Sequence, residues 1–374
     1  MRRFGRNDCA WNFLALAKYF CSTLKTKSGT VTPVLLPANE TETPPPMPVL
    51  YAHARGCPAF RALVPVLLVV ALVMGCARHA GGDGPRDVSD RTMRVVATTN
   101  ILGDLVRQVA GDHVELTTLM GPGIDPHLYK ASEGDVQRMA QADVVLYNGL
   151  DLEGKMTEVF AEMQRQGVRT SAVADAAVPD RLLIDSAEYA GNFDPHVWFD
   201  VELWRRVTQH VADVLARADT ARAELYRANA RRYAQRLDSL DRYVTKQTQR
   251  VPAPQRVLVT SHDAFSYLGR AYDVDVRGLQ GISTTSEAGA QDVQALASFV
   301  TKRRIPALFV ETSVSPRGIE AVRQAVRAKG FTVRVGGTLY GDALGDRGTP
   351  EGTYVGAVRH NIDTIVRGLL QDPT

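Results

Sequence analysis

Cysteine is scarce in this sequence, with only four among 374 residues: Cys9, Cys21, Cys57 and Cys76. The first three lie within or ahead of a predicted export signal, so the expected mature chain keeps Cys76 alone. A disulfide requires two cysteines, and a thiolate metal site usually requires several. The composition therefore excludes a structural disulfide and a cysteine-based metal cluster from the mature protein.

Long hydrophobic runs and a strong excess of one charge are also missing. The uncharged run at 62–75 has fourteen residues, fewer than the roughly 20 that cross a bilayer as a helix. The net charge is +3, and residues 1–75 hold eight Lys/Arg against three Asp/Glu, an excess of +5 that leaves about −2 for the remainder. With 45% apolar and 23% charged residues, the chain resembles a soluble globular protein, and no basic surface for nucleic acid is expected.

The segment at 47–75 has the pattern of a signal peptide. Two arginines precede the apolar run, and a glycine stands just before Cys76. The residues around that cysteine resemble a bacterial lipoprotein box, in which the cysteine is lipidated and begins the mature protein; a plain cleavage site is the alternative. We therefore predict lipidation at Cys76 and a lipidated tether at 76–93. Met47 begins a signal of conventional length, so residues 1–46 are expected to be a non-native N-terminal extension.

Strands and helices alternate in two stretches along the rest of the chain. Between these stretches, residues 201–251 contain neither glycine nor proline; their second half predicts a helix of roughly 28–30 residues, about 42–45 Å long. The fold class is thus α/β, with two lobes (94–218 and 252–374) of parallel-type sheets flanked by helices, joined by one long rigid linker helix within 219–251. The expected strands are 94–99, 114–120, 144–147, short strands within 170–184, 255–260, 274–277, 307–310 and 331–335; the expected helices outside the linker are 101–110, 132–142, 151–166, 264–271, 288–302, 317–329 and 351–370.

Two loops share the tripeptide Asp-Pro-His and end at His127 and His196. Proline fixes its own φ and biases the preceding residue away from helix, so both histidines are expected on stiff loops. A metal-ligating imidazole usually donates its second N–H to a carboxylate or a carbonyl, and Asp125 and Asp194 are candidates for that role. Two histidines in ordinary surface turns are the alternative.

The strand ends of the second lobe supply further candidates, because ligands of open α/β sheets bind at the carboxyl ends of the strands. The residues at or just after these strand ends include His262, Glu311 and either Asp342 or Asp346. Three imidazoles and one carboxylate in the cleft between the lobes suit zinc, with manganese or iron as alternatives. Glu311 is a further candidate for orienting a ligand. The remaining histidines of the mature chain are expected to be structural: His79, His113, His210 and His360.

The motifs together resemble a known family. Besides the two Asp-Pro-His loops, they are Val-Thr-Ser-His-Asp-Ala-Phe-Ser-Tyr at 259–267, Gly-Leu-Gln-Gly-Ile-Ser-Thr at 278–284, Tyr-Gly-Asp-Ala-Leu at 340–344, and Glu-Gly-Thr-Tyr at 351–354 leading into Asn-Ile-Asp-Thr-Ile at 361–365. In this order they resemble the solute-binding lipoproteins of zinc and manganese ATP-binding-cassette importers (cluster A-I, bacterial solute-binding protein family 9). The resemblance covers residues 94–370.

The resemblance implies a C-shaped pair of lobes with one divalent ion at their interface, bound by His127, His196, His262 and Asp342. It also implies capture of that ion and its delivery to an importer, with the permease and its ATPase as partners. The protein is then expected to be a monomer, exported to the periplasm or the outer face of the cytoplasmic membrane and held there by a lipid. Manganese-type relatives tend to carry glutamate where this chain has His262, which favours zinc. The absence of a long histidine-rich loop, found in some zinc-type relatives, keeps manganese as the alternative.

Two other functions are the alternatives: a zinc-dependent hydrolase and a surface adhesin using the same fold. Catalytic zinc typically keeps three protein ligands and an open position for water, whereas a fourth ligand is expected here. The sequence also has no His-Glu-x-x-His helix and no nucleophile motif. We therefore expect a binding protein and not an enzyme. A continuous linker helix further predicts small lobe displacements on metal release.

Overall fold

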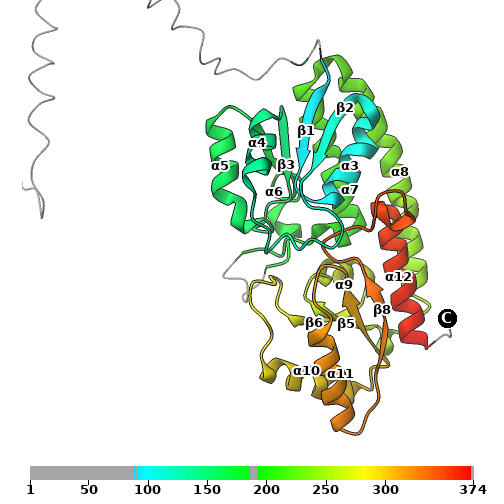
Figure 1. Ribbon diagram of the computed structural model, residues 1–374. Helices are drawn as coiled ribbons and strands as arrows, with labels where there is room; N and C mark the ends of the chain where they lie inside the picture. Colours follow the sequence, from blue (N-terminus) through cyan, green and yellow to red (C-terminus); the bar gives the residue numbers. More distant parts are fainter. Residues whose placement is uncertain (1–87, 89–90, 186–191, 372–374) are drawn as a thin grey trace, which may run out of the picture. The chain divides into compact units, whose positions relative to one another are not determined.

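Figure 1 shows the computed structural model of the protein, which describes residues 88, 91–185 and 192–371. These residues belong to one compact unit. The predicted extension, the signal peptide, Cys76 and most of the tether lie outside the described residues. Within the described ranges, no helix combines the length and the apolar character needed to cross a membrane.

The first lobe is built on a parallel sheet with the strand order β2 (Val114–Thr118), β1 (Met93–Ala97), β3 (Val144–Tyr147) and β4 (Arg169–Ala172). Its helices are α3 (Asn100–Ala110), α4 (Glu133–Gln141), α5 (Thr157–Arg165), α6 (Val173–Ala177) and α7 (Val201–Ala218). Successive residues of a strand point to opposite faces. Val95 and Val144 accordingly pack with α3 and α7, whereas Val96 and Val145 pack with α4 and α5. Burial on both faces explains the short continuous apolar runs in the sequence.

Two predicted boundaries in this lobe are wrong. The helix expected at 151–166 begins only at Thr157. Gly149, Leu150 and Asp151 have φ values of 84°, 51° and 63°, a left-handed backbone that cannot belong to a right-handed helix. The short strands expected within 170–184 reduce to β4, and α6 follows it directly. Short 3-10 turns occur at Gly111–His113, Gly154–Met156, Asp180–Leu182, Val197–Phe199, Thr220–Arg222, Ala253–Gln255 and Pro350–Gly352.

The second lobe contains two parallel strand pairs, β5 (Val257–His262) with β6 (Asp275–Gln280) and β7 (Ala307–Glu311) with β8 (Arg334–Leu339). Its helices are α9 (Ser266–Tyr272), α10 (Ala290–Arg303), α11 (Arg317–Ala328) and α12 (Tyr354–Leu370). The last strand was expected at 331–335, which is wrong. Gly336 and Gly337 lie inside β8, and glycine is unusual in strands, so the sequence pattern did not predict the strand there. Close packing requires both glycines: a Cβ at Gly336 would collide with Phe309, and one at Gly337 with Thr364.

The long helix between the lobes is α8 (Ala223–Thr248), with 26 residues rather than 28–30. Its length is about 39 Å at 1.5 Å per residue. Asp219 separates it from α7: its carboxylate accepts hydrogen bonds from the Arg222 guanidinium and the Tyr226 hydroxyl, both at 2.8 Å. α8 packs against α3 and α7 of the first lobe and against α9 and α12 of the second, and Figure 1 shows it beside α12.

One apolar core runs through both lobes. It contains Val95 and Trp204 of the first lobe, Leu237 of α8, and Phe309 and Ile365 of the second lobe. A wide hinge motion would expose part of this buried surface, at about 25 cal/mol for each Å² of apolar area. The continuous core therefore favours small displacements of the lobes.

Candidate metal centre

Four side chains converge at one point: His127, His196, His262 and Asp342. Each offers one ligand atom, and these atoms all lie within 4.8 Å of one another. The Nε2 atoms of His127 and His196 are 3.4 Å apart. Asp342 Oδ1 lies 3.4 Å from His196 Nε2, and Asp342 Oδ2 lies 3.3 Å from His262 Nε2 and 3.9 Å from His127 Nε2. All four residues are 0–3% exposed.

Each of the four comes from a different place in the fold. His127 lies on the loop between β2 and α4, and His196 on the loop that precedes α7. His262 is the last residue of β5, and Asp342 follows β8. His262 and Asp342 therefore lie at the carboxyl ends of neighbouring parts of the second lobe, at the end of β5 and just after β8. Asp346, the alternative to Asp342, is exposed and is not part of the cluster.

Two carboxylates orient two of the imidazoles. Asp194 Oδ1 accepts from the backbone N–H of His196 at 2.9 Å and lies 2.7 Å from its Nδ1. Glu311 Oε1 accepts from the backbone N–H of His262 at 3.0 Å, and its Oε2 lies 2.8 Å from Nδ1 of the same residue. The Asp194 contact places a proton on Nδ1 of His196 and leaves its Nε2 to point into the cluster, as a metal ligand requires. The Glu311 carboxylate lies beside Nδ1 of His262 and favours the same orientation of that ring.

His127 is held differently. Asp125 Oδ1 accepts from its backbone N–H at 2.9 Å, but Asp125 Oδ2 accepts from the Thr284 hydroxyl in the second lobe, at 2.5 Å. The Nδ1 atom of His127 is buried and has no hydrogen-bond partner among the described residues. Asp125 therefore fixes the loop and leaves Nδ1 of the ring without a carboxylate partner.

The loop that carries Asp342 is held by two buried amides that the sequence did not single out as site residues. Asn361 of α12 donates to Tyr340 O at 2.8 Å and accepts from Tyr340 N at 2.9 Å. Asn100 of α3 pairs in the same way with Leu344, at 3.0 and 2.8 Å. A residue from each lobe thus fixes the backbone on either side of Asp342.

Burial and mutual charge shape the protonation of the centre. Burial lowers the pKa of His127 to about 3, although the charge of Asp342 opposes this effect. Burial alone would also lower the pKa of His262, but the carboxylates of Glu311 and Asp342 raise it well above its ordinary value. Burial would raise the pKa of Asp342, but the imidazoles, His262 first, hold it well below its usual range. Near neutral pH the centre therefore offers an ionised Asp342 and a neutral His127, and His262 is the imidazole whose proton the neighbouring carboxylates hold most strongly.

Most of the described chain matches one known protein family. Residues 95–368 match the family described as zinc-uptake complex component A, periplasmic. The chain is a member of this family. Membership confirms the resemblance drawn from the Asp-Pro-His loops and the later motifs.

Relatives in this family differ in the metal that they are named for. The chain is 47% identical to the zinc-binding protein TroA of Treponema pallidum (strain Nichols), over 76% of this chain and 92% of TroA. It is 44% identical to the manganese-binding lipoprotein MntA of Bacillus subtilis (strain 168), over 81% of this chain and 97% of MntA. A solved structure of the periplasmic zinc-binding protein TroA superposes with a TM-score of 0.72 at 48% identity, covering 74% of this chain and 99% of that one.

The other described histidines lie outside the cluster. His210 Nε2 lies 2.9 Å from the Ser171 hydroxyl, and His360 Nε2 lies 3.0 Å from Thr338 O. His113 is an exposed residue in a 3-10 turn. His79 lies outside the described residues.

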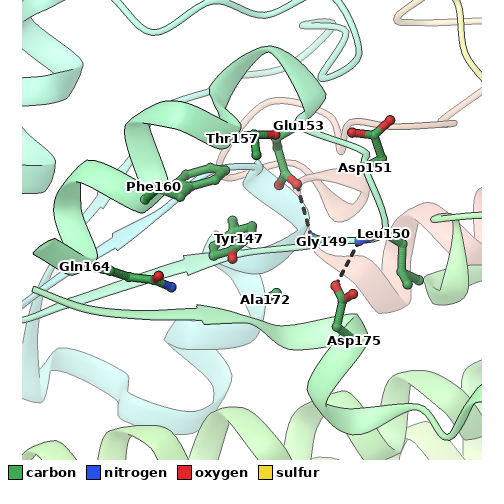
Figure 2. Close-up of a pocket in the computed structure, with 11 residues that line it drawn as sticks. Tyr147, Gly149, Leu150, Asp151, Glu153, Thr157, Phe160, Gln164, Ala172 and Asp175 are labelled. Atoms are coloured by element: carbon green, nitrogen blue, oxygen red, sulfur yellow. Dashed lines mark hydrogen bonds between the residues drawn. The ribbon is translucent and has the colours of Figure 1, made fainter. Parts of the chain in front are cut away.

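Figure 2 shows a separate cavity of about 330 Å³ between β3, β4 and α5. Its buried carboxylate, Glu153, accepts from the backbone N–H groups of Asn148 (2.8 Å) and Gly149 (3.2 Å). Burial raises the pKa of Glu153 and of Asp175, whose carboxylate binds the same loop. The loop in turn places Asn148 to donate to Pro195 O at 2.9 Å. These carboxylates therefore support the second Asp-Pro-His loop.

Proposed function

We propose that this protein captures one divalent cation outside the cytoplasm and delivers it to an ATP-binding-cassette importer. The observation that carries the proposal is the set of four buried ligand atoms within 4.8 Å of one another. We assign His127, His196, His262 and Asp342 as the ligands. The Asp342 oxygens and His262 Nε2 are buried and make no hydrogen bond with the described residues. A bound cation would compensate the burial of these groups.

Zinc is the favoured cargo and manganese the alternative. Tetrahedral zinc with bonds of about 2.0–2.1 Å holds neighbouring ligand atoms about 3.3 Å apart. Three of the separations in the cluster are 3.3–3.4 Å. Both Asp342 oxygens face imidazoles, an arrangement that also permits the higher coordination number of manganese. The zinc-binding and manganese-binding relatives support both cargoes.

Delivery requires a membrane partner, which we propose to be the permease and its ATPase. We expect a monomer in the periplasm or at the outer face of the cytoplasmic membrane, anchored by lipidation of Cys76. Family membership and the lipoprotein named among the relatives support this location. The lobe limits at 94–218 and 252–374, with the linker at 219–251, form part of the same proposal.

We further propose that the protein is not an enzyme. Catalytic zinc sites typically leave one coordination position to water, whereas four protein ligands converge here. The relatives are named as metal-binding and substrate-binding proteins, which favours transport over the zinc-dependent hydrolase. No observation favours the surface adhesin.

Calorimetric titration with zinc tests the ligand assignment. His127→Ala and His262→Ala should each abolish high-affinity binding, because each removes one ligand from a closed site. His210→Ala is the matched control, since this imidazole pairs with Ser171 outside the cluster, and it should bind as the wild type does. Unchanged zinc affinity in either ligand variant would refute the assignment. Metal analysis of protein purified from its host without chelators should find zinc.

A further inference from the structure

The side chain of Trp198 joins the two lobes beside the metal centre. It belongs to the 3-10 turn that follows His196, is 3% exposed, and donates from its indole Nε1 to Gly341 O at 3.2 Å. Gly341 directly precedes the ligand Asp342. The indole also meets the ring of His196 edge-on, with centroids 5.2 Å apart and planes at 69°. One side chain of the first lobe therefore contacts a ligand of its own lobe and holds the backbone next to a ligand of the other.

The backbone that accepts this hydrogen bond is packed tightly. A Cβ at Gly341 would collide with Oε2 of Glu311, the oxygen that lies 2.8 Å from Nδ1 of His262. Glycine is required there because the Glu311 carboxylate occupies the space of a side chain. The segment is thus confined by Glu311 and held by the indole. Without the indole bond it can move only away from Glu311, and Asp342 moves with it.

Trp198 is itself anchored by buried hydrogen bonds that cross between the lobes. The Tyr354 hydroxyl donates to Trp198 O at 2.6 Å, and the Tyr354 backbone N–H donates to the Asp104 carboxylate of α3 at 3.0 Å. Tyr354 is 1% exposed and Asp104 is 2% exposed. Buried polar networks of this kind rigidify the segments that they join. The indole is therefore fixed before it binds the loop of Asp342.

We propose that Trp198 is a positioning residue that fixes the Asp342 carboxylate and thereby sets the ratio of zinc to manganese affinity, an inference that rests on the metal-binding function proposed above. Asp342 is the only carboxylate among the four ligands, and each of its oxygens lies 3.3–3.4 Å from an imidazole Nε2. Zinc binds well to imidazoles, and many zinc sites use three protein ligands. Manganese prefers carboxylate and water oxygens and takes more of them. Displacement of this carboxylate therefore weakens manganese binding more than zinc binding.

The variant Trp198→Phe tests the inference, because it keeps an aromatic ring and removes the indole N–H. Calorimetry with each cation, using a competing chelator for zinc, measures the two affinities. Manganese affinity should fall about 10–100-fold, the range for loss of a group that supports a metal ligand. Zinc affinity should fall by no more than about threefold, because three imidazoles remain and two of them keep their carboxylate partners.

Trp204→Phe is the matched control. The Trp204 indole is 0% exposed and its ring lies 5.3 Å from that of Tyr354, but its Nε1 has no hydrogen-bond partner among the described residues. The variant makes the same substitution in the same core without removing a bond to the Asp342 loop. It should lower the free energy of unfolding and leave the ratio of the two affinities unchanged.

A second variant covers the case in which Trp198→Phe does not fold. Tyr354→Phe removes only the hydroxyl that anchors Trp198 and should shift the ratio in the same direction by a smaller factor; an unchanged ratio would then overturn the inference. Equal losses of both affinities in Trp198→Phe would also overturn it, as would an unchanged manganese affinity or the same change of ratio in Trp204→Phe. A wild type that binds zinc but not manganese would overturn it too. Failure of the wild type to bind either cation would instead refute the proposed function.

Discussion

The two Asp-Pro-His loops have the same tripeptide but different surroundings. In the second loop, Asp194 and His196 are both 0% exposed. The Asp194 carboxylate binds the backbone and the ring of His196, and the Tyr267 hydroxyl donates to Asp194 O at 2.9 Å. In the first loop, the neighbouring Ile124 and Leu128 are 41% and 46% exposed.

This difference indicates that the same Asp-Pro-His tripeptide has a different role in each loop. The ring of His196 is fixed before a metal arrives, since a carboxylate holds its second nitrogen. The position of the His127 ring depends on two hydrogen bonds to the Asp125 carboxylate, one from the backbone N–H of His127 and one from the Thr284 hydroxyl. We infer that the second loop contributes pre-organised affinity, whereas the first loop is the part of the centre that rearranges when the cation enters or leaves.

The largest expected effect is that of His196→Ala. It removes a pre-organised ligand and should abolish the stabilisation by metal, which for the wild type amounts to about 4 kcal/mol at a zinc concentration of a thousand times Kd. Thermal unfolding with and without zinc measures this effect. If zinc stabilised His196→Ala more than His127→Ala, the first loop and not the second would supply the pre-organised ligand.

The next effect is that of pH. The carboxylates of Glu311 and Asp342 raise the pKa of His262, so zinc must displace any proton that this imidazole holds in the metal-free protein. Affinity should therefore be lost as the pH falls below that pKa, by about tenfold per pH unit for one displaced proton. His127, with a pKa of about 3, should not contribute near neutral pH. Calorimetry in buffers of different ionisation enthalpy counts the protons released, and a count of zero would contradict this account.

A smaller effect is expected from the two aspartates of the loops. Asp194→Asn should weaken zinc binding by about 10–100-fold, because it removes the carboxylate that orients His196. Asp125→Asn should weaken it less, since its amide oxygen can still accept from the backbone of His127. Competition with a fluorescent zinc chelator measures both affinities. Equal losses in the two variants would show that the first aspartate orients its histidine as strongly as the second.

The smallest effect is expected from the outer hydrogen bonds of the loops. Tyr267→Phe deletes the hydroxyl that binds Asp194 O and accepts from Ile184 N, and should lower the free energy of unfolding by about 1 kcal/mol. Thr284→Val removes the hydroxyl that donates to the Asp125 carboxylate and should lower the free energy of unfolding by at least as much, because its acceptor is charged, while zinc dissociation becomes faster. Urea unfolding and a chelator chase distinguish the two variants. Faster zinc dissociation in Tyr267→Phe alone would contradict the assignment of mobility to the first loop.

Much of the centre could be predicted from local patterns. The proline in each tripeptide marked His127 and His196 as loop residues, and the strand-end rule for α/β sheets led to His262. The amides of Asn100 and Asn361 could not be assigned in this way, because Asn100 bonds to a residue 244 positions away. Nothing near an asparagine in the sequence indicates which distant backbone it will bind.

The sequence by itself determined the α/β class, the linker helix and the kinds of ligand atom, because strand and helix periodicity and residue chemistry are local properties. The strand-end rule left Asp342 and Asp346 open and only the family resemblance selected Asp342; the tertiary structure shows that Asp342 lies in the cluster while Asp346 is exposed. It also decided that two identical tripeptides differ in exposure and in the partners of their imidazoles. Burial and hydrogen bonding depend on which distant segments pack together, and no local pattern carries that information.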